Sequence, residues 1–182
     1  MTAGTDGRPS AALDLDVTMS MNGHLCRVTP RKHRDLAASG GVTSLLLVGG
    51  EGRAPLELGK DWHMLHFLLT GSAWGGEPPL ADAILGGEEF GAELGYGRAR
   101  YLAPERVEVI ARALEAVSTE QLRERFDPHK LARAEVYPIG AQELSRDDLE
   151  AYFSSIFHRF DDLVDYYGDA AEAGEGMLLA LL

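Results

Sequence analysis

The C-terminal part of the sequence holds a long, regular repeat of apolar residues, and this repeat limits the fold more than any other feature. From Leu149 to Tyr167 the apolar residues recur at steps of three and four, the spacing of one face of an α-helix. We therefore predict one amphipathic helix from Ser145 to about Ala171, with its aromatic stripe against a core. The apolar positions are Leu149, Tyr152, Phe153, Ile156, Phe157, Phe160, Leu163, Val164 and Tyr167.

Several other segments supply partners for such a helix. Strands are predicted at Gly23–Val28 and at Met177–Leu182, the second of them short, apolar and buried in the sheet. Trp62–Thr70 is apolar nearly all round and predicts a buried helix with Asp61 as its N-cap. Three further helices are predicted to begin after Thr29, at Pro104 and after Ser118, the last with a capping box to Gln121.

Some segments are ambiguous, but no linker or internal repeat divides the chain. Val42–Val48 fits either a strand or a buried helical turn, and the glycine-rich Glu88–Gly97 is predicted to be irregular. The sequence thus predicts one compact, helix-rich α+β domain over residues 19–182, with a small mixed sheet and the long C-terminal amphipathic helix. Residues 1–18 are expected to form a flexible extension.

Composition fits a globular protein of this size. The chain has 182 residues, of which 45% are hydrophobic, enough for a sizeable core without covalent staples. A single cysteine, Cys26, cannot form an internal disulfide and suits a reducing compartment. Apolar runs such as Leu45–Val48 and Met177–Leu182 are far too short to span a bilayer. We therefore expect a cytoplasmic protein that does not enter a membrane.

The chain is strongly acidic, with 17 Lys and Arg against 29 Asp and Glu, a net charge of −12. Broad nucleic-acid binding is excluded, because the phosphate backbone would repel such a protein. Ten of the acids lie between Glu143 and Glu175, where only two arginines oppose them. This run is either a solvated helix face or a docking surface for a basic partner, centred on Asp161, Asp162 and Asp165.

Five short blocks occur in a characteristic order along the chain. They are Lys60–Gly71, Ile84–Gly87, Gly95–Leu102, Arg125–Pro128 and Glu135–Pro138. Together they resemble the YfbM-like family of small bacterial proteins of unknown function, over the chain from about Met19 to its C-terminus. The resemblance implies a compact α+β domain and supplies no activity.

The helix predicted at Trp62–Thr70 places two histidines and a tryptophan close together. His63 and His66 stand three residues apart, and Trp62 and His66 stand four apart. Two histidines are half of a zinc site, but their spacing is not that of metalloproteases and no further ligand is indicated, so we predict no metal. The three residues either line a small-molecule cleft or are hydrogen-bonded parts of the core.

A second group of polar and aromatic residues follows a glycine turn. Gly95–Tyr101 contains two arginines and two tyrosines. An arginine can hold a carboxylate or phosphate with two parallel hydrogen bonds, or it can pair with an acid of its own chain. If the fold brings the candidates together, one ligand pocket would gather Trp62, His63, His66, Glu88, Tyr96, Arg100, Tyr101 and Tyr137.

The sequence contains no complete catalytic constellation and does not reveal a biochemical activity. Cys26 is predicted to be an inert buried thiol, and no Gly-x-Ser-x-Gly elbow is present. We therefore predict a non-enzymatic binding protein that uses Asp161, Asp162 and Asp165 against a basic protein, as an inhibitor or immunity factor would. The alternative is an enzyme or a binder of a small anionic ligand with the pocket described above, and a subunit of a larger assembly is a third option. No cofactor is indicated.

Overall fold

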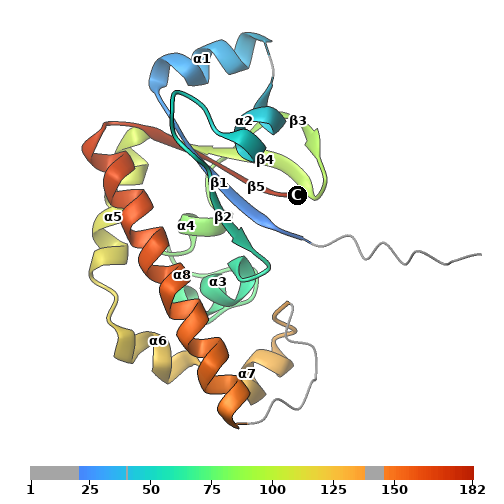
Figure 1. Ribbon diagram of the computed structural model, residues 1–182, viewed down its shortest axis with the longest axis vertical. Helices are drawn as coiled ribbons and strands as arrows, with labels where there is room; N and C mark the ends of the chain where they lie inside the picture. Colours follow the sequence, from blue (N-terminus) through green and yellow to red (C-terminus); the bar gives the residue numbers. More distant parts are fainter. Residues whose placement is uncertain (1–20, 40, 138–145) are drawn as a thin grey trace, which may run out of the picture.

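A five-stranded sheet with the spatial order β2-β1-β5-β4-β3 forms the centre of the molecule (Figure 1). The computed structural model describes residues 21–39, 41–137 and 146–182. The α+β class is confirmed, with a sheet that is antiparallel rather than mixed, because an apolar pattern fixes which residues are buried and not which way a strand runs. The strands are β1 Gly23–Val28, β2 Leu56–Gly59, β3 Glu88–Leu94, β4 Gly97–Leu102 and β5 Gly176–Leu181.

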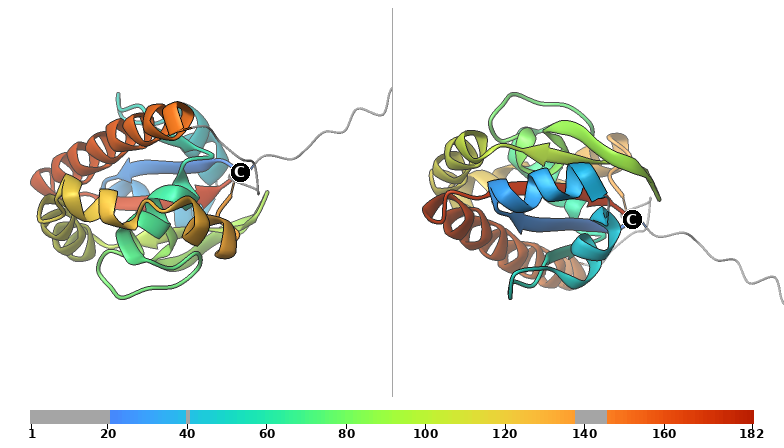
Figure 2. Two further views of the ribbon diagram at one scale, coloured as in Figure 1. Left: turned by 90° about the horizontal axis from the view of Figure 1, so that it is seen from below. Right: turned by 90° about the horizontal axis from the view of Figure 1, so that it is seen from above.

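Helices cover both faces of this sheet. Figure 1 shows α1 and α2 above the strands and α3, α6 and α7 below them, and Figure 2 shows the same layers from two further sides. In the described parts of the chain the helices are α1 Pro30–Ser39, α2 Val42–Val48, α3 Trp62–Thr70, α4 Asp82–Leu85, α5 Pro104–Glu115, α6 Thr119–Arg125, α7 Pro128–Arg133 and α8 Arg146–Glu172.

β5 is the central strand, and five of its six residues are buried. Alternate residues of a strand point to opposite faces. Met177 and Leu179 accordingly join the core built by α3, α5 and α8, whereas Leu178 and Ala180 join the core built by α1 and α2. The prediction of a buried final strand is confirmed, and its continuous apolar sequence follows from having a helical layer on each side.

The long helix predicted from the apolar repeat is α8. Its buried residues include Phe153, Ile156, Phe160 and Leu163, which pack into the same core as the apolar face of α5. Tyr167 is also fully buried, and its hydroxyl donates a hydrogen bond of 2.9 Å to the carbonyl of Ala83. Each such side chain contributes on the order of 2 kcal/mol by burial, so α8 is fixed firmly to the rest of the domain.

Of the predicted N-terminal helix caps, the structure shows two and lacks one. Thr29 Oγ1 accepts a hydrogen bond from the backbone N–H of Lys32, and the capping box of Ser118 and Gln121 before α6 is complete. Asp61 precedes α3, but its carboxylate does not cap that helix. It turns instead toward α8 and accepts a hydrogen bond of 3.2 Å from the hydroxyl of Tyr152.

The structure gives the secondary structure of two other segments, one predicted ambiguously and one predicted to be irregular. Val42–Val48 is the helix α2, and the segment predicted to be irregular is mostly the strand β3, paired with β4. Its register shifts between Phe90 and Glu93, where Gly91 has a positive φ of 76°, which explains why no regular alternation marks the strand. No helix in the part of the chain that the structure describes is long and apolar enough to cross a membrane.

Candidate functional site

The solvent-facing side of α8 carries a row of carboxylates at helical spacing. Asp161, Asp165, Asp169 and Glu172 are four, four and three residues apart, so they lie along one line of the helix, named here the acidic stripe. All four are exposed. Asp162, which the sequence placed in the same group, is exposed beside the stripe.

Ion pairs neutralise these acids unevenly. Asp169 pairs with Nη1 of Arg27 at 2.8 Å, and Asp162 lies 3.9 Å from Nη1 of Arg159. The other three acids of the stripe have no cationic partner among the residues that the structure describes. Like charges one helical turn apart repel by a few tenths of a kcal/mol, so the stripe carries a small energetic cost in the isolated protein.

Glu175, at the C-terminal end of the acidic run, does not belong to this surface. Glu175 is only 2% exposed, and its carboxylate pairs with Nε of Arg27 at 2.8 Å and with Nη2 of Arg53 at 2.7 Å. The guanidinium of Arg27 also lies 5.9 Å from the ring centre of Tyr166. Glu175 is therefore a structural anchor between the end of α8 and β1, and Glu143 lies outside the described residues.

The three ligand residues predicted on α3 are buried in the core rather than open to a cleft. Trp62, His63 and His66 are each at most 1% exposed. The indole N–H of Trp62 donates a hydrogen bond of 3.0 Å to the carbonyl of Met21. His66 Nε2 lies 2.9 Å from the carbonyl of Gly75, to which it must donate, and its Nδ1 is buried without a partner in the described parts of the chain.

His63 joins two distant segments through both ring nitrogens. Nδ1 accepts a hydrogen bond of 3.0 Å from the backbone N–H of Tyr137, so Nε2 carries the proton and donates at 2.8 Å to the carbonyl of Ala73. Burial lowers the pKa of His63 and the pKa of His66 below 6.5. Both rings are therefore neutral at pH 7, and they hold the loop that follows α3.

That loop presents an aromatic residue that the sequence did not single out. Trp74 is 62% exposed, and its ring centre lies 4.6 Å from that of His63 and 5.7 Å from that of Trp62. Nearby, the ammonium of Lys60 lies 5.9 Å from the ring centre of Tyr137. The signal that could have identified it is a tryptophan within a Gly- and Pro-rich stretch of the sequence.

The remaining predicted residues lie around β3 and β4, in two separate cavities. Glu88 and Tyr101 line a cavity of about 280 Å³, beside the ion pair that joins α4 to α5. Tyr96 and Arg100 line a smaller cavity of about 60 Å³. Nη1 of Arg100 donates a hydrogen bond of 3.1 Å to the carbonyl of Gly87. The eight candidates thus fall into two groups: three residues on α3, to which Tyr137 is joined by its hydrogen bond to His63, and four around β3 and β4. The buried α3 residues line neither of these cavities.

Metal binding and thiol chemistry find little support in the described residues. No group of three His, Cys, Asp or Glu side chains there could hold a metal ion. Cys26 is buried in β1, where burial raises the pKa of its thiol to about 11. The thiolate, which is the nucleophilic form, is therefore scarce at neutral pH.

Comparison with known proteins gives the family. A family model described as a domain of unknown function, DUF1877, matches residues 19–180. The chain belongs to the DUF1877 family. The crystal structure of YfbM from Escherichia coli, a protein of unknown function, is similar with a TM-score of 0.71 and 23% sequence identity, over 89% of this chain and 100% of that one. No curated protein matches.

The likeness to YfbM shows the fold, and the DUF1877 match extends across all five strands. The predicted membership of a YfbM-like family is confirmed. Three of the five blocks on which that prediction rested form α3, the end of α4 and β4, which are core and hairpin elements. DUF1877 membership carries no activity, so function has to be sought on this chain's own surface.

Proposed function

We propose that this DUF1877 protein is a non-enzymatic binding protein that docks a basic protein partner on the acidic stripe of α8. One observation carries the proposal: Asp161, Asp165 and Glu172 are exposed, aligned on one helix face and without a cationic partner in the described parts of the chain. Charges left in this state are available to arginines and lysines of a partner.

The rest of the molecule suits such a surface. The buried face of α8 holds the helix rigidly, so the backbone that carries the carboxylates is fixed before a partner arrives and little backbone entropy is lost on binding. The net charge of −12 would speed the approach of a basic protein. An inhibitor or immunity factor that neutralises a basic target would use a surface of this kind, and the single cysteine suits action in the cytoplasm.

A shared small-molecule pocket is the weaker candidate. It requires Trp62 and His66 to meet Glu88, Tyr96 and Arg100, whereas the α3 residues are buried and hydrogen-bonded to backbone carbonyls. We therefore do not assign acid–base catalysis to His66.

The test is affinity capture from a lysate of the source cells with three forms of the chain. The stripe variant combines Asp161→Lys, Asp165→Lys and Glu172→Lys. The control variant makes the same change of charge at exposed acids elsewhere, with Glu77→Lys, Glu89→Lys and Glu124→Lys. The proposal predicts a basic protein that the wild type and the control variant retain and the stripe variant loses. Equal capture by all three forms would contradict it.

A further inference from the structure

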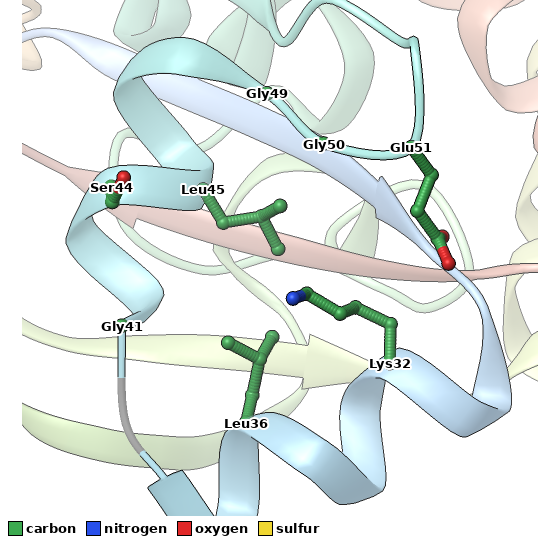
Figure 3. A pocket seen from close by; sticks show the side chains of 8 residues that line it. All are labelled: Lys32, Leu36, Gly41, Ser44, Leu45, Gly49, Gly50 and Glu51. Atoms are coloured by element: carbon green, nitrogen blue, oxygen red, sulfur yellow. The ribbon is translucent and has the colours of Figure 1, made fainter.

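A cavity of about 270 Å³ lies between α1, α2 and the loop that follows α2 (Figure 3). This is the helical layer on the sheet face opposite to the core of α8, so the cavity is separate from the acidic stripe. α1 contributes Lys32 and Leu36 to its wall, and α2 contributes Leu45. The loop contributes Gly50 and Glu51.

Lys32 is the unusual residue in this wall. Figure 3 shows its side chain reaching from α1 into the space between Leu36 and Leu45. Its ammonium group has no carboxylate partner among the described residues, whereas Lys60 lies over an aromatic ring and Lys130 has a carboxylate 4.0 Å away. A cation that faces a cavity and has no carboxylate within ion-pair distance in the described parts of the chain is available to bind an anion from solution.

Glu51 supplies an acceptor at the same cavity. Its carboxylate lies 3.4 Å from the hydroxyl of Thr29 and 3.7 Å from Nη1 of Arg53. The loop that carries it is a tight turn, in which Gly50 and Arg53 exchange backbone hydrogen bonds of 3.1 and 3.0 Å. The turn fixes the backbone of Glu51 beside the cavity, and its carboxylate can accept a hydrogen bond from a hydroxyl or an ammonium group.

Glycine is required where the loop meets α2. At Gly49, which lines the cavity, φ is 79° and a Cβ atom would lie 2.0 Å from the carbonyl oxygen of Arg53, so a larger residue would break the turn. The volume of the cavity falls just below the usual range of about 300 to 1,000 Å³ for ligand sites, which limits the occupant to a small molecule.

We propose that this cavity binds a small monocarboxylate that carries a hydroxyl or amino group. The carboxylate pairs with Lys32, the carbon chain contacts Leu36 and Leu45, and the hydroxyl or amino group donates to Glu51. Glu51 already adds a negative charge to the wall opposite Lys32, so a dianionic phosphate is repelled more strongly than a monocarboxylate and fits less well.

The experiment is a titration of the full ¹⁵N-labelled chain, followed by amide NMR shifts. The probes are 3-hydroxybutyrate, 4-aminobutyrate, butyrate and inorganic phosphate. At least one of the two substituted carboxylates should bind more tightly than butyrate and shift the amide signals of residues 32–36 and 44–51. Lys32→Met should weaken that binding about tenfold or more. Lys60→Met, a matched loss of charge elsewhere, should leave it unchanged.

Glu51→Gln separates the two halves of the proposal, because it should reduce the preference for a substituted carboxylate over butyrate. Three results would overturn the proposal. They are a Kd above about 10 mM for both substituted carboxylates, equal binding by wild type and Lys32→Met, and phosphate binding as tight as that of the carboxylates. None of these bears on the acidic stripe, which lies on another face.

Discussion

The backbone N–H of Tyr137 donates a hydrogen bond of 3.0 Å to Nδ1 of His63, across 74 residues of sequence. Because Nδ1 accepts, the proton of the neutral ring stays on Nε2, which donates to the carbonyl of Ala73. A protonated ring would have to give up the bond to Tyr137, since Nδ1 would then carry a proton as well. The geometry therefore makes the fold depend on the neutral form of this histidine.

Acid should consequently destabilise the protein at a mild pH. Burial lowers the pKa of His63 and of His66 in the folded state, so below about pH 6.5 the unfolded chain binds protons that the folded chain does not. Their contribution to stability is complete above that pH and is lost as the pH falls toward the folded-state values. Each histidine should lower the free energy of unfolding by up to about 1.4 kcal/mol per pH unit.

Urea unfolding between about pH 7.5 and pH 5 measures this slope. The His66→Leu variant is the control, because it removes one of the histidines whose pKa burial lowers and should make the dependence less steep. A slope that is the same in wild type and in His66→Leu would show that His66 does not titrate as its burial demands.

Glu175→Gln should cost about 3 kcal/mol of stability. The substitution removes the buried carboxylate that pairs with both Arg27 and Arg53, and it leaves the largely buried Arg27 with Asp169 as its one remaining acid in the described parts of the chain. The matched control is Glu150→Gln, because Glu150 pairs with Arg123 at 3.0 Å on an exposed surface and should cost less than about 1 kcal/mol. Chemical unfolding of both variants gives the comparison, and similar costs for the two would contradict the buried pair.

Trp74→Phe should remove most of the fluorescence that acrylamide can quench. The chain has two tryptophans, of which Trp62 is fully buried and Trp74 is 62% exposed. The residual emission of Trp74→Phe should come from Trp62 and be blue-shifted. Unchanged quenching in this variant would mean that the loop after α3 does not present Trp74 to solvent.

Neutralising part of the acidic stripe should stabilise the free protein slightly. The double change Asp161→Asn and Asp165→Asn removes a repulsion between adjacent helical turns, which is worth a few tenths of a kcal/mol at low salt. Asp162→Asn is the control, because it loses a contact with Arg159 and should give no gain. A clear loss of stability in the double variant would reveal a cationic neighbour of the stripe. In that case a change at the stripe would alter the stability of the free protein as well as its affinity for a partner.

The local features of the fold were within reach of the sequence. The apolar repeat of α8, the capping box at Ser118 and the buried strand β5 each depend on residues that lie close together in the chain. The direction of the strands and the hairpin of β3 and β4 were missed, because both depend on partners that the local pattern does not encode.

The candidate site was harder to predict for a related reason. α3 is apolar nearly all round, so the sequence could not tell that its histidines serve the loop bearing Trp74 rather than a cleft. In the same way the acidic run looked uniform, although Glu175 turns inward to Arg27 at the point where the helix gives way to the central strand. Which charges stay unpaired is a property of the folded surface.

The most direct measurement is the affinity of a captured partner for the wild type, the stripe variant and the control variant at about 0.05 M and about 0.3 M salt. Docking on the acidic stripe predicts that the wild type and the control variant bind alike at low salt and weaken together at high salt. The stripe variant should bind at least about tenfold more weakly at low salt. Binding that is insensitive to salt and equal in all three forms would contradict a role for the stripe.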